Sequence, residues 1–194
     1  PSPVAPCADA IFTCYGDQSS LAHPIYHRTR QSAMDYIGSV VETAKDHKGA
    51  TLIGFDFSFG YPCGFTKHLT GSRDVRSLWL CLADRIQDDA QNANNRFQVA
   101  ADINGMFPGV GPFWGAPANV QYADLPHKGS QRQGHGLPEL RATEEGVKGA
   151  QSSWKLFTTG SVGSQAILGI ARLHHLISRF PDIHLWPFDG PIPP

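Results

Sequence analysis

The sequence lacks the marks of several large protein classes. Its 16 basic and 17 acidic residues nearly cancel, leaving a formal net charge of −1, and no run of Lys or Arg stands out. Because sequence-independent nucleic-acid binding depends on neutralising phosphates, this balance argues against a general nucleic-acid binder. No apolar run approaches the roughly 18 residues of a membrane-spanning helix, and no signal-peptide pattern opens the chain. We therefore expect a soluble, cytoplasmic protein without a membrane partner.

Recognisable cysteine and histidine motifs are absent as well. The four cysteines, Cys7, Cys14, Cys63 and Cys81, form no C-x-x-C pair and have no histidine at zinc-finger spacing. Buried free thiols are the expected state. The nine histidines form no recognisable set of metal ligands, and no G-x-S-x-G sequence marks a hydrolase nucleophile. These absences exclude a patterned structural zinc site and a serine-hydrolase elbow.

The length and composition of the chain indicate a folded protein rich in loops. The chain has 194 residues, of which 41% are apolar, enough to bury one full core. Its 20 glycines, 15 prolines and low charged fraction of 17% are typical of extensive irregular structure. With no internal repeat or long linker, residues 1–194 are expected to form a single domain. Both ends are Pro-rich connecting segments, so we expect a first strand before residue 1 and a further portion after residue 194.

Hydrophobic periodicity predicts a mixed α/β fold. Two β-rich runs, 10–15 and 24–29, are separated by a polar loop and predict an antiparallel pair. Apolar residues at steps of three and four predict helices, which cover 31–47, 75–86, 95–107 and 162–179.

The remaining segments predict buried strands and one long loop. The short apolar runs 51–57 and 183–188 are typical of strands covered on both faces. Segment 108–140, rich in Gly, Pro and polar residues, predicts an ordered loop or lid. Loops of this length are uncommon in compact domains unless they serve a site.

Asp56 is the first candidate for chemistry. It stands near the end of the predicted strand 51–57, where ligands of open α/β sheets usually lie. An acid in an apolar run is costly to bury unless it is paired, hydrogen-bonded or bound to a metal. The alternative is a structural turn in which Asp56 accepts backbone N–H groups.

A second candidate is the small-residue start of the helix predicted from 162. Small side chains let backbone N–H groups approach an anion, and the helix N-terminus favours negative charge. The spacing matches neither a Walker A loop nor a dinucleotide fingerprint, so helix capping and close packing remain an equal alternative. The residues concerned are Gly160, Ser161, Gly163 and Ser164.

Polar and aromatic side chains complete the set of candidates. Arg141 has the two-pronged geometry that grips phosphate or carboxylate, and Lys155 adds a point charge beside Trp154; surface ion pairs are the alternative. An aromatic wall for a ring ligand competes with ordinary core packing. The further candidate ligand-binding residues are Asn95, Arg96, Tyr61 and Trp114, and Glu144 is a candidate second carboxylate.

Several motifs in this order resemble an uncharacterised bacterial family of ribonuclease H-like domains of unknown function. They are G-F-D-F-S-F-G-Y-P (54–62), N-N-R-F (94–97), F-P-G-V-G-P-F-W-G (107–115), R-A-T-E (141–144), W-K-L (154–156), G-S-V-G-S-Q (160–165) and W-P-F (186–188). Some members carry names that invoke molybdopterin guanine dinucleotide or cobalamin biosynthesis. The resemblance implies a ribonuclease H-like mixed sheet flanked by helices, with a long loop insertion.

The same resemblance implies metal-dependent phosphoryl chemistry. Such nucleases hold two divalent ions between clustered carboxylates. Asp56 matches the acid of their fourth strand, Glu144 is a possible substitute ligand, and the other family acids would lie outside residues 1–194. The expected function is that of a phosphodiesterase or nuclease using Mg²⁺ or Mn²⁺, weakly bound here, on a phosphate-bearing small molecule or nucleic acid. The alternatives are a nucleotide- or pterin-binding accessory protein of cofactor biosynthesis, and a non-catalytic scaffold.

Overall fold

A computed structural model describes residues 10–17, 19–45 and 50–191 and has a mixed α/β composition. The chain separates into two compact units. Unit 1 comprises Pro1–Gly54 and Gln87–Asn94, and unit 2 comprises Phe55–Ile86 and Asn95–Pro194. In the part of the chain that is described, no helix is long and apolar enough to span a bilayer.

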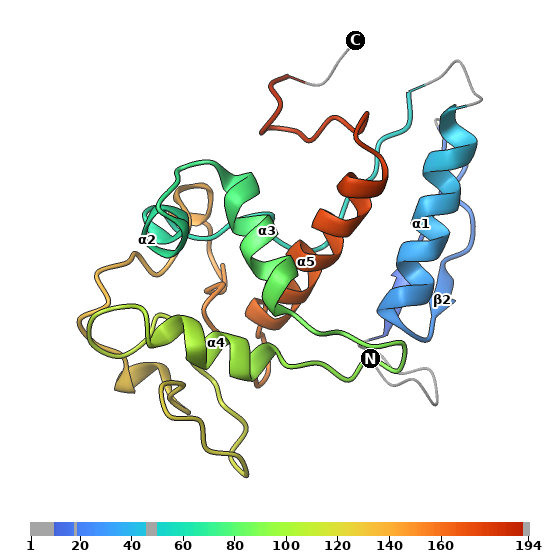
Figure 1. Cartoon of the computed structure of the whole chain (residues 1–194). Coiled ribbons are helices and arrows are strands. Elements are labelled where there is room, and N and C mark those ends of the chain that lie inside the picture. The colour runs from blue at the N-terminus through green and yellow to red at the C-terminus, as the bar shows by residue number, and fades with distance from the viewer. Residues whose placement is uncertain (1–9, 18, 46–49, 192–194) are drawn as a thin grey trace. The chain divides into compact units, whose positions relative to one another are not determined.

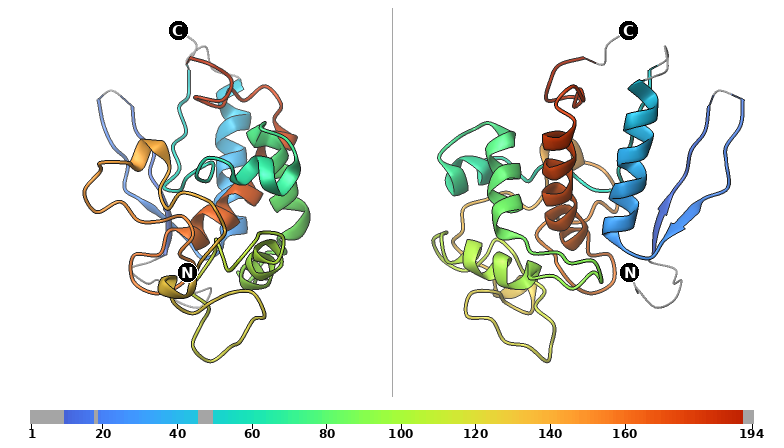
Figure 2. Two further views of the ribbon diagram at one scale, coloured as in Figure 1. Left: turned by 90° about the vertical axis from the view of Figure 1, so that its left-hand side faces the viewer. Right: turned by 45° about the vertical axis from the view of Figure 1, so that its right-hand side comes forward.

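Unit 1 contains the predicted antiparallel pair and the first predicted helix. Strands β1 (Ile11–Thr13) and β2 (Ile25–His27) pair with Phe12 opposite Tyr26 (Figure 2). The Thr13 hydroxyl and the Nε2 atom of His27 lie 2.8 Å apart across this pair. Helix α1 (Arg30–Lys45) follows β2 after a short turn and confirms the periodicity seen in the sequence.

An ion pair at the start of α1 holds the segment 87–94 in unit 1. Arg30 donates from Nε to one carboxylate oxygen of Asp88 at 2.8 Å and from Nη2 to the other at 2.5 Å. The same guanidinium donates to the Asn92 carbonyl at 2.8 Å. The two-pronged geometry with a nearly buried carboxylate makes this pair stronger than an ordinary surface contact.

Helices α3 (Val75–Arg85) and α5 (Gly163–Arg179) pack side by side and form the centre of unit 2 (Figure 1). Both were predicted from their apolar stripes. Asp74 begins α3 by accepting the Arg76 N–H at 2.9 Å. The fully buried side chains at the centre include Leu78, Trp79 and Leu82 of α3 and Ile167, Ile170 and Leu173 of α5.

Two shorter helices and a long loop complete unit 2. Helix α2 spans Phe65–Thr70, and α4 spans Arg96–Asn104, three residues shorter at its end than predicted. Segment 108–140 forms an ordered loop as predicted, with a single 3₁₀ turn at Gly129–Gln131 among its residues. A second 3₁₀ turn follows at Ala142–Glu144.

The Asn104 side chain fixes this loop to the end of α4. It is 3% exposed, and its amide accepts the Phe113 N–H at 2.8 Å while donating to the Phe113 carbonyl at 2.9 Å. It also donates to the Asp124 carbonyl at 2.7 Å. One side chain therefore takes the place of a β-ladder partner for two separate stretches of the loop. Figures 1 and 2 show the loop running beside α4.

Two predicted strands and the burial of the cysteines are corrected by the structure. Segment 51–57 has no regular secondary structure; of its apolar residues, Leu52 is exposed, and the rings of Phe55 and Phe57 pack 5.2 Å apart. Segment 183–188 is not a strand either, because it folds into a turn in which the Asp189 N–H donates to the Leu185 carbonyl. The ribonuclease H-like arrangement, which needs the strand at 51–57, is therefore not confirmed. Cys14, Cys63 and Cys81 are free, as predicted, but Cys14 and Cys63 are exposed and Cys81 is only partly buried; Cys7 lies outside the described residues.

Replacing Asn104 with Ala should destabilise unit 2 by about 3 kcal/mol. The substitution removes three hydrogen bonds and leaves buried backbone groups of the loop without partners. The matched control is Asn119→Ala, at an exposed position of the same loop, which should change the free energy of unfolding by less than about 0.5 kcal/mol. Urea unfolding measures both values, and equal losses in the two variants would contradict the role given to Asn104.

Candidate functional site

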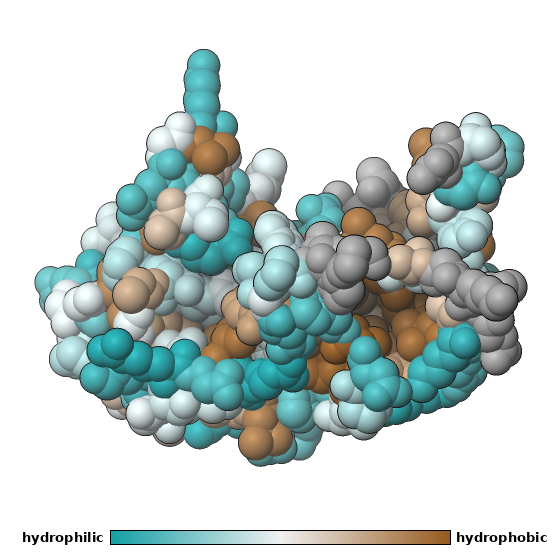
Figure 3. All heavy atoms as spheres, turned by 90° about the horizontal axis from the view of Figure 1, so that it is seen from above, coloured by the Kyte–Doolittle hydropathy of each residue, from teal (hydrophilic) through white to brown (hydrophobic). Residues whose placement is uncertain are grey.

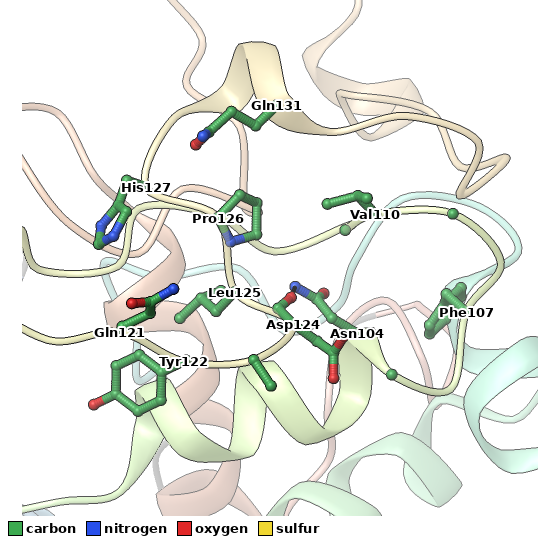
Figure 4. A pocket seen from close by; sticks show the side chains of 14 residues that line it. Asn104, Phe107, Val110, Gln121, Tyr122, Asp124, Leu125, Pro126, His127 and Gln131 are labelled. Atoms are coloured by element: carbon green, nitrogen blue, oxygen red, sulfur yellow. Dashed lines mark hydrogen bonds between the residues drawn. The ribbon is translucent and has the colours of Figure 1, made fainter.

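The long loop and the end of α4 line an open pocket of about 330 Å³ in unit 2 (Figure 4). This volume lies at the lower end of the range found for small-molecule sites. Helix α4 runs beneath the pocket, Phe107 lies at one end, and Gln121, Tyr122 and His127 lie at the other. The lining residues are Asn104, Gly105, Phe107, Gly109, Val110, Gly111, Gln121, Tyr122, Ala123, Asp124, Leu125, Pro126, His127 and Gln131.

Close backbone approach shapes this pocket. Gly109 has a φ of +73°, and a Cβ atom there would lie 2.0 Å from the Gln133 carbonyl oxygen. Only glycine fits at such a position. The N–H of the next residue, Val110, donates to that same Gln133 oxygen at 2.7 Å, which closes one wall of the loop.

Asp124 carries the only formal charge among the lining residues. Its backbone carbonyl accepts the Asn104 amide, and the residue is exposed. One carboxylate oxygen lies 3.3 Å from the position that a Cβ atom would occupy on Gly105, so the glycine gives it room. Over residues 10–17, 19–45 and 50–191, the Asp124 carboxylate has no ion-pair or hydrogen-bond partner.

His127 adds a second polar group with a fixed orientation. Its Nδ1 atom lies 3.1 Å from the Ala116 carbonyl oxygen. A carbonyl oxygen only accepts, so Nδ1 carries the proton, and in the neutral ring Nε2 is the acceptor. The Gln131 side-chain oxygen accepts the Lys128 N–H at 2.8 Å, which leaves its NH₂ group as a donor. The pocket thus combines a carboxylate, an imidazole acceptor and an amide donor.

Five of the residues predicted from the sequence meet at the start of α5. Arg96 donates from Nε to the Ser164 hydroxyl at 2.8 Å, and this hydroxyl donates to the Leu156 carbonyl at 2.5 Å. The Gly163 N–H donates to the Lys155 carbonyl at 2.9 Å. Trp114 pairs with Lys155 in an isolated parallel bridge. The hydrogen bonds among them agree with the packing alternative for this helix start, although the buried Nε1 atom of Trp114 has no hydrogen-bond partner in the described part of the chain.

The two predicted cations of this region are occupied by internal partners. The Lys155 ammonium donates to the Thr159 carbonyl at 2.5 Å and lies 5.7 Å from the Trp114 ring centre. The Arg96 guanidinium lies 4.1 Å from the centre of the Phe97 ring. Gly160 and Ser161 belong to the turn before α5, where the Ser161 N–H donates to the Thr158 carbonyl at 3.1 Å.

Arg141 and Glu144 form a local pair within one 3₁₀ turn. The guanidinium donates to one Glu144 oxygen at 2.6 Å, and the Arg141 N–H donates to the other at 2.9 Å. Partial burial opposes ionisation, but these hydrogen bonds and the Arg141 charge outweigh it and lower the pKa of Glu144. The role that the structure gives to Glu144 is therefore its pairing with Arg141.

Tyr61 and Asn95 also have structural surroundings. The Tyr61 ring is buried and stacks on Trp154 with ring centres 5.1 Å apart, so Tyr61 belongs to the aromatic core. Burial raises the pKa of its hydroxyl. Asn95 precedes α4 and donates from its side chain to the Arg85 carbonyl at 3.0 Å.

Asp56 is exposed in a bend, not at the end of a strand. The neighbouring Phe57 ring packs against α5 at Gly169, where a Cβ atom would lie 2.7 Å from the ring. In the described ranges, no three His, Cys, Asp or Glu side chains come together as a metal site would require. Mg²⁺ seeks near-octahedral oxygen ligation. The described residues around Asp56 therefore do not fit the predicted metal, and Glu144 is not brought to it by any hydrogen bond or ion pair.

The pocket was missed by residue-level reasoning from the sequence, although one signal pointed to it. The length of segment 108–140 predicted a loop that serves a site, and the pocket lies within that loop and the end of α4. Comparison with known proteins adds no further assignment, since no family model, no curated protein and no solved structure matches the chain. The resemblance to ribonuclease H-like domains stays a prediction.

Gly163→Ala should lower the stability of unit 2 by about 1–3 kcal/mol. The new Cβ atom would lie 2.5 Å from the Ser153 carbonyl oxygen and 2.6 Å from that of Lys155, so the backbone must shift. Gly60→Ala is the control, because a Cβ atom there meets only Val75 at 3.8 Å. Thermal and urea unfolding compare the two variants. An undiminished stability of Gly163→Ala would count against the packing role and favour an open, anion-binding helix start.

Proposed function

We propose that this chain binds a small molecule in the pocket beneath the long loop. The observation that carries the proposal is a hollow of about 330 Å³ whose one charged lining residue, the exposed Asp124, has no partner in the described part of the chain. Several polar groups converge on this hollow, and convergent polar groups in a pocket are the usual sign of a ligand site.

Of the ligands expected from the sequence, a nucleotide or a pterin suits this proposal through its ring. Tyr122 is half-buried and offers aromatic surface at one end of the pocket, and flat heterocycles stack on such rings. The absence of Lys and Arg from the lining gives a phosphate group no counter-charge. The function proposed is therefore that of a binding protein, as in the accessory-protein alternative, with the ring held in the pocket.

Filling the pocket should abolish binding. Ala123 lines the pocket at an exposed position, so Ala123→Phe places a ring in the ligand volume without disturbing the core. Ala118→Phe, at an exposed position of the same loop outside the lining, is the matched control. The measurement is a titration of labelled protein by NMR with pterin, guanosine monophosphate, benzamidine, benzamide and benzoate.

At least one of these compounds should shift the amide signals around the pocket. Its affinity should fall by at least about tenfold in Ala123→Phe and by less than about twofold in Ala118→Phe, because one blocks the volume and the other does not. The proposal fails if none of the compounds shifts these signals, or if both variants bind as the wild type does.

A second candidate function keeps the ribonuclease H-like fold and its phosphodiesterase chemistry. The observation in its favour is that Asp56 is exposed, so that its carboxylate is accessible to a cation or a substrate. Its weakness is the missing cluster of further ligands among the residues described. This candidate therefore depends on ligands from segments other than 10–17, 19–45 and 50–191.

The second candidate predicts Mn²⁺-dependent hydrolysis of bis(p-nitrophenyl) phosphate that depends on Asp56. Asp56→Asn should reduce the rate by more than the roughly 10- to 100-fold that loss of an outer-shell partner costs a metal site. Asp102→Asn, at an exposed position of α4 whose carboxylate accepts only the Gln98 amide, should leave the rate unchanged. Equal turnover by Asp56→Asn and the wild type would eliminate this candidate.

The scaffold alternative receives less support. Exposed hydrophobic residues are interspersed with hydrophilic ones over the left-hand part of Figure 3, which belongs to unit 2. Docking surfaces for proteins usually show a contiguous apolar patch. The face drawn there does not favour a protein partner over a small ligand.

A further inference from the structure

The pocket beneath the long loop has a definite electrostatic character that narrows its ligand. Of its 14 lining residues, one is an acid and none is Lys or Arg. A carboxylate without an ion-pair partner favours a positive group near it, and Asp124 is exposed and open to a ligand. Ligand selection by this pocket should therefore depend on charge as well as on shape.

The basic residues next to the pocket do not neutralise it. Arg132 follows the lining residue Gln131 in sequence, but its guanidinium donates to the Pro112 carbonyl at 3.1 Å and to Glu139 at 2.8 Å. It also lies 5.5 Å from the centre of the Trp114 ring. Arg132 is thus engaged on the loop itself, and neither it nor the exposed Lys128, which follows His127, forms an ion pair with Asp124.

The other groups that line the pocket also suit a ligand that donates hydrogen bonds. When its ring is neutral, His127 offers Nε2 as an acceptor, since Nδ1 donates to the Ala116 carbonyl. The Tyr122 ring, which also lines the pocket, has the negative face that attracts organic cations. A carboxylate, an imidazole acceptor and an aromatic face together match an N–H-rich cation.

We propose that the pocket recognises a small organic nitrogen cation, an amine or amidine carried on a flat ring, through the Asp124 carboxylate. This inference rests on the proposed binding function and specifies the ligand class. An amidinium group donates two parallel N–H bonds to one carboxylate, and charge-assisted bonds of this kind are about twice as strong as neutral ones. A bare metal ion is a poorer match, because one carboxylate supplies too few oxygen ligands.

Three ring compounds of nearly equal size and shape test the charge preference. Benzamidine is cationic, benzamide is neutral and benzoate is anionic, and their binding is followed through the amide signals of the pocket. We expect benzamidine to bind at least about tenfold more tightly than benzamide, and benzoate to bind most weakly. In Asp124→Asn the preference for benzamidine should fall below about twofold, whereas Asp102→Asn on α4 should retain it in full.

The outcomes separate this inference from the function on which it rests. If benzamide or benzoate binds at the pocket as tightly as benzamidine, or if Asp124→Asn keeps the preference, the ligand class is wrong and the binding function stands. If none of the three shifts the pocket signals, the inference is overturned; if pterin and guanosine monophosphate fail as well, the binding function falls with it. The comparison of compounds on the wild-type protein needs no variant to fold. The urea midpoint of Asp124→Asn shows whether its backbone contact with Asn104 persists.

Discussion

The side-chain amide of Asn104 is the interaction on which the candidate site depends. A loop of more than thirty residues has few ladder partners for its backbone, and buried N–H and C=O groups without partners are costly. Asn104 meets this requirement at two places, because it pairs with both polar backbone groups of Phe113 and with the carbonyl of Asp124. The pocket wall that carries the Asp124 carboxylate is therefore positioned by a residue at the end of a helix.

Aromatic packing holds the other side of the same loop. Phe113 is fully buried and meets Trp154 edge to face, with ring centres 5.2 Å apart. The Trp154 indole N–H donates to the Pro138 carbonyl at 2.9 Å and so binds the far end of the loop. Large rings with one polar atom are suited to this task, since they bury much apolar area and still satisfy a backbone acceptor. The loop is ordered by point contacts with the core, with no sheet to support it.

The elements that periodicity determines could be predicted from the sequence. The apolar stripes of α3 and α5 face each other in the core, so local pattern and tertiary burial agree there, and the short hairpin followed from two β-rich runs. The strand at 51–57 could not be told from an irregular segment, because a short apolar run fits either state. Phe55 and Phe57 are partly buried there by ring packing, not by pairing with a neighbouring strand.

The candidate site could be predicted only in outline. The physical reason is that the charge presented to a ligand depends on which charged side chains are already paired within the protein. Arg141, Lys155 and Arg96 are basic residues that suggest an anion site, yet each of them is directed to an acceptor or a ring within unit 2. Asp124 lies in no motif of the sequence, and only the structure shows that it lines the pocket while the neighbouring Arg132 pairs with Glu139.

The number of basic and acidic residues in a segment therefore does not give the sign of the charge that a ligand meets. That sign is set by the groups that remain after internal pairing. In this pocket, the group that remains is the Asp124 carboxylate.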